Sequence, residues 1–285
     1  VDNFFIGIAL GANVVIANAI GREDTDAVHR AVHTAVVVAV LGGVLVTVLG
    51  ELAAGPALRA LNVPAEVLPY AVLYLRIYLL GVPVILLYNF EAAIFRSVGD
   101  TRVPLQTLAF SGVLNVLLNL FFVIVLHMTV NGVATATVLS NAISSVLLFV
   151  RLRRSDKAIH LEWTALRIDR RSLQKILQIG IPAGIQSAVF SISNIVIQSA
   201  INSLGTVVMA ASSAAFNIEV VAYDVLNSFS QACTTFVGQN YGAGKLDRCR
   251  KTLVLCLVED ALASGIAILL VLGSGHFLLS LFNRD

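Results

Sequence analysis

Charged residues are scarce in this sequence. Lys, Arg, Asp and Glu make up 13% of the 285 residues, whereas apolar types make up 58%. Soluble domains have roughly 25% charged and 45–50% apolar residues, so an ordinary soluble globular protein is excluded. A net charge of +2 gives neither the basic field of a nucleic-acid-binding protein nor the charge density of a disordered chain. We therefore expect an integral membrane protein with no nucleic-acid partner.

Residues that make disulfide frameworks and metal sites are also few. The three cysteines, Cys233, Cys249 and Cys256, lie in or beside apolar stretches, and we interpret them as small packing residues. The five histidines are scattered and form no metal-binding motif. Gly242 and Gly244 have G-x-G spacing, but no strand precedes them and no Gly-Lys-Ser or Gly-Lys-Thr follows, so no nucleotide is expected. The sequence predicts no enzyme activity, no metal and no organic cofactor.

Long apolar runs dominate what remains. Because a hydrocarbon core about 30 Å thick needs roughly 20 apolar residues per helix, eight runs predict transmembrane helices. They lie near 4–21, 31–50, 68–94, 104–126, 131–150, 175–202, 206–238 and 252–273. These runs are too long and continuous for barrel strands. The predicted fold class is all-α, a polytopic transmembrane helical bundle.

The basic residues lie mainly on one side of the predicted spans. If the spans alternate across the membrane, 15 of the 19 lysines and arginines fall on that side. They lie in the connections 22–30, 95–103, 151–174 and 239–251. By the positive-inside rule this side is cytoplasmic. The loop 151–174 is the only long connection, so we place it between an N-terminal lobe, 1–150, and a C-terminal lobe, 175–285.

An internal repeat appears when the sequence is aligned with itself at an offset of 221 residues. Gly21 then superposes on Gly242, and Asp26 on Asp247. The matched loops are six spans apart, so both copies cross the membrane in the same sense, as in parallel-repeat transporters. The repeat predicts a parent of about twelve spans in two lobes of six. The chain begins with Val, without a basic leader, and ends just after an apolar run, and we expect it to be a piece of that parent.

Several motifs resemble one family of membrane proteins. They are Tyr74-Leu75-Arg76-Ile77 with Gly81-Val82-Pro83, the run Phe95-Arg96-Ser97-Val98-Gly99-Asp100-Thr101-Arg102-Val103-Pro104, Leu114-Asn115, Gly132-Val133-Ala134-Thr135-Ala136-Thr137, Ile179-Gly180-Ile181-Pro182, and Gly238-Gln239-Asn240-Tyr241-Gly242-Ala243-Gly244-Lys245. In this order and spacing they resemble the multidrug and toxic compound extrusion (MATE) family.

That resemblance implies a twelve-helix antiporter in a plasma membrane, such as the bacterial inner membrane, with two six-helix lobes around a central cleft. It implies export of cationic, amphipathic small molecules in exchange for Na⁺ or H⁺, and this chain would supply the second to ninth helices. The family's coupling acids map poorly onto it. One belongs to the absent first helix, and Asn119 and Phe190 occupy the positions of two others.

Polar side chains share one half of each of two adjacent predicted helices. On 206–238 an advance of 100° per residue places the acids Glu219 and Asp224 in the polar half, opposite Val221 and Val225. Facing polar halves predict a wet cavity, because unpaired polar groups are costly in hydrocarbon. Its predicted lining is Glu219, Asp224, Tyr223, Asn217 and Gln231, with Gln186, Asn194 and Gln198 on 175–202 and Asn119 in the N-terminal lobe. For the Ser and Thr residues we favour hydrogen bonding between helices.

A carboxyl away from water can bind H⁺, Na⁺ or a cationic drug, each excluding the others, as an antiporter needs. We expect Glu219 to carry this role, Asp224 to contribute less, and Asn119 to act as a neutral hydrogen-bonding group. Glu91 lies near the cytoplasmic surface, where snorkelling or capping is expected. Glu259 and Asp260 are adjacent, so they cannot share one helix face, and we favour structural roles for both.

Other functions remain open at this point. A lipid-linked oligosaccharide flippase of the same superfamily would need a strongly cationic cavity to hold a pyrophosphate, whereas the predicted cavity carries carboxylates. A receptor or a non-transporting membrane scaffold is compatible with any helical bundle. An intramembrane enzyme would need a nucleophile paired with a base, or a metal set, at depth, and the sequence offers neither.

Overall fold

The computed structural model describes residues 2–60 and 66–282, and within these ranges it is helical without strands. Its long helices are α1 (Asp2–Gly21), α2 (Thr25–Ala60), α3 (Leu68–Ser97), α4 (Arg102–Leu120), α5 (Val130–Arg153), α6 (Arg170–Asn202), α7 (Thr206–Gly242) and α8 (Leu246–Phe282). A π-helical turn, Phe121–Val125, extends α4, and a short 3₁₀ turn, Trp163–Ala165, lies between α5 and α6. The predicted all-α fold with eight helices is confirmed.

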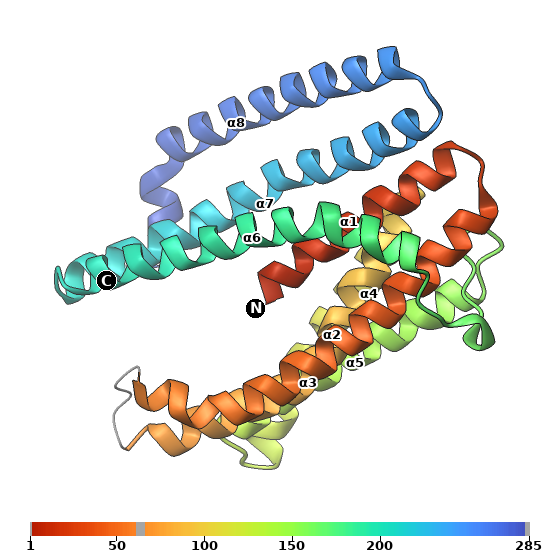
Figure 1. Cartoon of the computed structure of the whole chain (residues 1–285). Helices are drawn as coiled ribbons and strands as arrows, with labels where there is room; N and C mark the ends of the chain where they lie inside the picture. The colour runs from red at the N-terminus through yellow and green to blue at the C-terminus, as the bar shows by residue number, and fades with distance from the viewer. Residues whose placement is uncertain (1, 61–65, 283–285) are drawn as a thin grey trace.

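The helices form two groups that meet at one end (Figure 1). Helices α2 to α5 make one group and α6 to α8 the other, and they diverge away from the end where α1 joins α2 and α5 leads into α6. Helix α1 lies between the groups and packs against α6 and α7 on one side and against α2 and α3 on the other. The chain section before residue 150 therefore contacts the section after residue 175 chiefly through α1.

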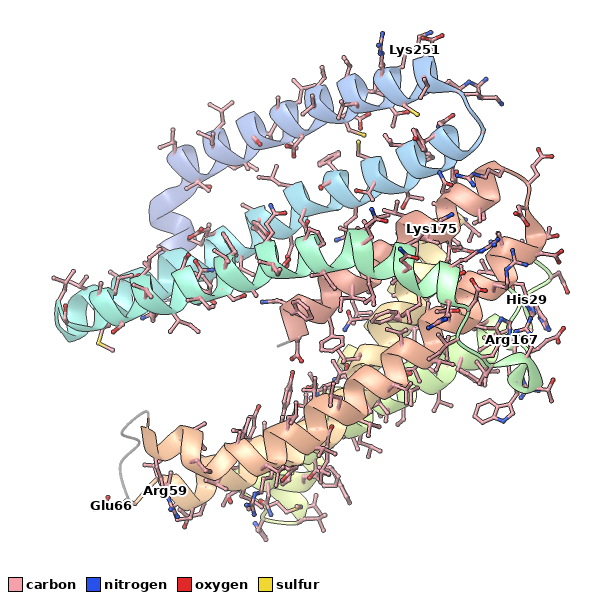
Figure 2. All side chains as sticks on the ribbon, viewed as in Figure 1. His29, Arg59, Glu66, Arg167, Lys175 and Lys251 are labelled. Carbon is pink, nitrogen blue, oxygen red and sulfur yellow. The ribbon has the colours of Figure 1, made fainter. Side chains whose placement is uncertain are left out.

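Seven of these helices are long and apolar enough to cross a membrane; α7 is not among the seven. Many of its side chains are polar, and it runs alongside α8 and crosses α1 (Figure 1). In Figure 2, His29, Arg167, Lys175 and Lys251 lie at one end of the molecule, and Arg59 and Glu66 lie at the other. The predicted basic, cytoplasmic connections therefore gather at a single end, as the positive-inside rule requires.

Several helices extend beyond their predicted bounds. Helix α2 was predicted for 31–50 but covers 25–60, and α8 was predicted for 252–273 but covers 246–282. The additional turns carry charged residues, which an apolar-run criterion rejects although Arg, Lys and Glu form helices well. The predicted spans thus mark the apolar part of each helix, and α2 and α8 continue beyond it at both ends.

The buried core lies around α1, α2 and α3, near the end with the basic connections. Its large members include Ile16, Phe90 and Ile94, together with Ile159 and Leu161 from the segment after α5. That segment is also held by backbone and side-chain hydrogen bonds. The backbone N–H of Glu162 donates to Nε2 of His33 over 3.0 Å, and Nδ1 of His33 lies 2.7 Å from the carbonyl oxygen of His29. The long connection is therefore packed onto the N-terminal helices.

Glycines allow α1 and α6 to touch backbone to backbone. Gly7 and Gly11 of α1 face Gly184 and Gly180 of α6, each pair in G-x-x-x-G spacing. A Cβ added at Gly180 would lie 2.7 Å from Cα of Ile8, closer than real Cβ atoms approach other atoms. Such small-residue contacts allow the close van der Waals packing that drives helix association in membranes.

The contact between α1 and α7 follows the predicted repeat. A Cβ at Gly21 would meet the carbonyl of Gln239, and one at Gly242 would meet the carbonyl of Asn18. Gly242 is 221 residues after Gly21, and Gln239 is 221 residues after Asn18. The two contacts are therefore equivalent in the repeat, because each joins the glycine of one copy to the residue three positions before the glycine of the other. Gly238 faces Ala17, its own partner at that offset. Equivalent helices thus meet around a local two-fold relation, as expected for a parallel repeat.

Candidate functional site

The residues predicted to line a cavity are mostly at the surface of the described chain. Gln186, Gln198, Asn217, Glu219, Tyr223 and Asp224 are exposed, and Asn194 and Gln231 are half-buried. The facing halves of α6 and α7 approach each other at one aromatic pair, where the rings of Phe190 and Tyr223 stack with centroids 5.8 Å apart and planes 12° apart. Within the described residues, Glu219 and Asp224 make no hydrogen bond and no ion pair.

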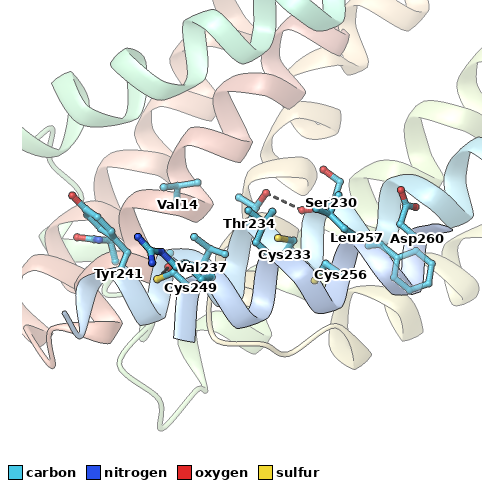
Figure 3. A pocket seen from close by; sticks show the side chains of 15 residues that line it. Val14, Ser230, Cys233, Thr234, Val237, Tyr241, Cys249, Cys256, Leu257 and Asp260 are labelled. Carbon is cyan, nitrogen blue, oxygen red and sulfur yellow. Dashed lines mark hydrogen bonds between the residues drawn. The ribbon is translucent and has the colours of Figure 1, made fainter. Parts of the chain in front are cut away.

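A pocket of about 690 Å³ lies between α1, α7 and α8 (Figure 3). Ser230 and Thr234, from the predicted polar half of α7, line it, and the Thr234 hydroxyl donates to the carbonyl of Ser230 over 2.8 Å. Its walls are otherwise largely apolar: Val14, Phe229, Cys233, Val237, Leu253, Cys256 and Leu257. A pocket of this size and lining fits a drug-sized amphipathic molecule.

One carboxyl group, that of Asp260 on α8, lines this pocket. Its Oδ1 atom is buried and has no hydrogen-bond partner among the described residues, and Ser230 and Phe229 of α7 also line the pocket. Glu259, its neighbour in sequence, is exposed and does not line the pocket. An unpartnered carboxylate oxygen in an apolar pocket is costly unless a proton or a cation accompanies it. Sequence reasoning had favoured structural roles for both acids, because periodicity alone cannot tell which one faces α7.

The other side of α7 is held against α1 by a buried polar pair. Both Nδ2 and Oδ1 of Asn13 lie 3.2 Å from Oγ1 of Thr235. The Asn13 side chain therefore either donates a hydrogen bond to the Thr235 hydroxyl or accepts one from it. One turn further on, Gln239 Nε2 donates to the carbonyl of Ser97 at the end of α3 over 2.6 Å. These bonds connect α7 to both α1 and α3. Asn13 was not singled out from the sequence, where a lone Asn in an apolar run carries little signal.

Asn119 belongs to a polar cluster between α4 and α5 that is separate from the α7 pocket. Its Nδ2 donates to the carbonyl and to Oδ1 of Asn115, each over 3.0 Å. Asn115 in turn donates to Oγ of Ser140 over 3.2 Å. The Oδ1 atom of Asn119 is buried and unpartnered, directly before the π-helical turn at 121–125. Such turns often accompany functional sites.

Glu91 corrects one sequence prediction. It neither snorkels nor caps, because its side chain is fully buried in α3 at 0% exposure. Oγ of Ser145 donates to its Oε2 over 3.0 Å, and Oε1 has no partner. Its neighbours on α3, Phe90 and Ile94, are fully buried as well, so this carboxyl lies in the buried core. The N-terminal helices therefore also hold a buried carboxyl.

An ion pair joins two of the basic connections. Lys157 Nζ donates to Oδ2 of Asp100 over 2.7 Å, which joins the α3–α4 turn to the segment after α5. This hydrogen bond holds the pKa of Asp100 below its usual value, despite some opposing desolvation. The carboxylate therefore stays charged at neutral pH, and the connection between the two chain sections is anchored at this turn.

Comparison with known proteins gives consistent matches over nearly the whole chain. The MatE family model matches residues 3–121 and 182–285. "Probable multidrug resistance protein YoeA" of Bacillus subtilis is 28% identical over 99% of this chain and 63% of its own length. "Multidrug export protein MepA" of Staphylococcus haemolyticus is 21% identical over 97% of this chain and 61% of its own. A protein named "FAD transporter" from Shewanella oneidensis is 24% identical over 90% of this chain and 58% of its own.

Solved structures share the fold. "Crystal structure of MATE in complex with MaL6" superposes with a TM-score of 0.92 at 21% identity, covering 99% of this chain and 63% of that one. An outward-facing multidrug resistance MATE family transporter gives 0.88 at 20% identity, with the same coverage. The chain thus spans somewhat less than two thirds of the proteins that it matches. Together with its apolar helices, these matches identify a multi-pass integral membrane protein.

Proposed function

Since this chain belongs to the MatE family, we propose that the protein containing it is a secondary active antiporter. It exports cationic, amphipathic small molecules from the cytoplasm in exchange for Na⁺ or H⁺, across a plasma membrane such as the bacterial inner membrane. The observation that carries the proposal is the largely apolar pocket between α1, α7 and α8 with the Asp260 carboxyl in its wall. Relatives named for multidrug export or resistance support the same function.

The pocket suits such a cargo by its mixture of surfaces. Phe229 and Leu257 offer apolar and aromatic contact to the body of an amphipathic molecule, and Asp260 offers a negative charge. A cation near the face of an aromatic ring gains further electrostatic attraction. Binding of a cation and binding of a proton at one carboxyl exclude each other, and this exclusivity couples cargo release to ion entry.

The acids of α7 and α8 stand at different depths. Measured along the helices from their cytoplasmic ends at a rise of 1.5 Å per residue, Asp260 lies about 21 Å in, Asp224 about 27 Å and Glu219 about 35 Å. We propose that Asp260 binds the cationic cargo and the coupling ion by turns, while Glu219, nearer the outer end, passes the coupling ion to and from the pocket. Asp224, between them, contributes less, and Asn119 serves as a neutral hydrogen-bonding group in the N-terminal helices.

The test is cation transport by the full-length protein in proteoliposomes, driven by a Na⁺ or a H⁺ gradient. Glu219→Gln should abolish gradient-driven transport of a cationic dye such as ethidium, and Asp224→Asn should weaken it. Asp260→Asn should raise the dye concentration needed for half-maximal transport, while the matched control Glu259→Gln should not. If Glu219→Gln transports at the wild-type rate with the same pH and Na⁺ dependence, the coupling acid lies elsewhere.

A flippase for lipid-linked oligosaccharides is the second candidate, and it would need a basic pocket for a pyrophosphate. The Asp260 pocket includes a single basic side chain, Arg250, ten residues before Asp260 on α8, so it lacks the basic cluster that a pyrophosphate needs. A strongly basic pocket lies instead at the cytoplasmic end of the bundle. A scaffold or receptor role would not explain why the Asp260 carboxyl has an unpartnered oxygen in a pocket.

A further inference from the structure

A second pocket, of about 770 Å³, lies at the cytoplasmic end of the molecule, beside the last turns of α1. The last turns of α1, the first turns of α2 and α6, and Tyr241 at the end of α7 enclose it. Five basic side chains line it: Arg22, Arg30, Arg170, Arg171 and Lys175. In Figure 2, Lys175 lies near the start of α6, at the end where the basic connections gather.

The two carboxylates in this pocket are already engaged. Oδ1 of Asp24 accepts the backbone N–H of Ala27 over 2.9 Å. Oδ2 of Asp169 accepts both the N–H and the hydroxyl of Ser172, each over 2.8 Å, as the N-cap of α6. These hydrogen bonds hold the pKa of Asp169 below its usual value, with a smaller contribution from the charges of Arg30 and Arg171. Both acids thus serve helix starts.

Among the described residues, none of the five cations forms an ion pair within 4.0 Å. Among the residues that the structure describes, the ion pairs within 4.0 Å are those of Arg76 with Glu51 and Lys157 with Asp100. None of the pocket's basic side chains belongs to either pair. Gathering like charges around one cavity is unfavourable, and an anion with several acceptor oxygens would relieve the repulsion through charge-assisted hydrogen bonds. A phosphate group is such an anion, and it fits the positive charge of this pocket.

The apolar part of the pocket wall indicates which kind of molecule carries the phosphate. Away from the basic rim the lining becomes apolar at Val14, Val15 and Ile179, and Ile179 is 38% exposed. Val14 lies about 12 Å from Arg22 along α1 at 1.5 Å per residue. This distance, from the charged end of a transmembrane helix into its apolar part, matches the step from a lipid headgroup to its acyl chains. Basic pockets between helices on the cytoplasmic side suit anionic lipid headgroups.

We propose that this pocket binds the phosphodiester of an anionic phospholipid from the cytoplasmic leaflet. The headgroup contacts Arg22, Arg30 and Arg171, and the upper acyl chain lies along Val14 and Ile179. A lipid bound there contacts α1, α6 and α7 together, and so bridges helices from both halves of the chain. The two pockets have Val14, Asn18 and Tyr241 in common but share no charged residue, so the lipid headgroup and the cationic cargo use different charged side chains.

The experiment measures lipid binding to the delipidated full-length protein by native mass spectrometry in detergent. Dioleoyl phosphatidylglycerol is titrated against dioleoyl phosphatidylcholine. The wild type should bind the anionic lipid about tenfold more tightly, and the triple variant Arg22→Gln, Arg30→Gln, Arg171→Gln should lose that preference, because each removed guanidinium costs a charge-assisted contact. The matched control neutralises Arg151, Arg153 and Arg154, which are on the same membrane side but outside this pocket. It should keep the preference.

Three results would overturn the proposal: equal binding of the two lipids by the wild type, equal loss in the control, or displacement of the lipid by glycerol 3-phosphate at similar concentration. The last would mean that the site serves a soluble phosphate compound. If the triple variant fails to fold, the single exposed change Lys175→Gln takes its place, with an expected loss of about threefold. Lys245→Gln, also exposed and outside the pocket, is then the control.

Discussion

Helix α1 and the outer half of α7 illustrate opposite ways to place polar and small residues in a membrane protein. Around α1, glycines bring backbones into contact and the Asn13–Thr235 pair is buried. Along the outer half of α7, Asn217, Glu219 and Asp224 are exposed, and the Phe190–Tyr223 stack is a ring contact with α6. The first region is built for close packing, where a single added methyl group is felt. The second has polar groups available for a cargo or an ion.

Breaking the glycine contact should have the largest effect. In Gly11→Val the new Cβ would lie 2.8 Å from the backbone nitrogen of Gly180. Separating α1 from α6 should cost about 3 kcal/mol of stability. Gly265→Val on α8 is the control, since nothing lies within 4 Å of a Cβ there, and it introduces the same residue into a helix. Thermal unfolding in detergent compares the two, and equal shifts in Tm would contradict the account.

The buried polar pair should come next. Thr235→Val removes the hydroxyl that serves Asn13 and leaves a buried amide unpaired, at a cost of about 1–3 kcal/mol. Thr234→Val changes the neighbouring hydroxyl, which bonds within its own helix, and should cost less than about 0.5 kcal/mol. Unfolding by denaturant measures both. A similar cost for the two variants would mean that the α1–α7 contact does not depend on this pair.

A smaller effect is expected where α6 and α7 meet at the aromatic stack. A double-mutant cycle of Phe190→Ala and Tyr223→Ala should give a coupling energy of about 0.5–1.5 kcal/mol, the range for stacked aromatic pairs. A cycle of Val189→Ala with Val221→Ala, both exposed and outside this stack, should give none. Zero coupling in the aromatic cycle would show that the outer halves of these helices do not rest on each other.

The smallest effect belongs to the cytoplasmic ion pair. Asp100→Asn should cost less than about 1 kcal/mol, because both side chains are partly exposed and screened by solvent. The pKa of Asp100 is lower in the folded protein than in the unfolded chain. The stabilisation is therefore present above the unfolded pKa of about 4 and is lost as the pH falls through the folded value. Wild type and variant should differ in Tm at pH 7 and converge below pH 4, whereas a constant difference would contradict the assignment.

The sequence predicted the number of helices, their order and the gathering of the basic connections at one end, because apolar runs and basic loops are set by the bilayer itself. It also predicted the repeat that relates α1 to α7. It did not distinguish Asp260 from Glu259, since the rotation of α8 about its axis depends on packing against α7. Glu91 was misassigned because proximity to the surface in sequence said nothing of the side chains that enclose it. The G-x-x-x-G spacing at Gly7 and Gly180 was a readable signal for the α1–α6 contact.

The central claim is that Asp260 gives the α1–α7–α8 pocket its affinity for cations. Equilibrium binding of ethidium to the full-length protein, followed by fluorescence polarisation, tests it without any need for transport. Asp260→Asn should raise Kd by about tenfold or more, since a carboxylate–cation contact at an effective dielectric of about 20 exceeds 1.4 kcal/mol. Glu259→Gln should leave Kd within about twofold. Equal Kd values for the wild type and Asp260→Asn would contradict the claim.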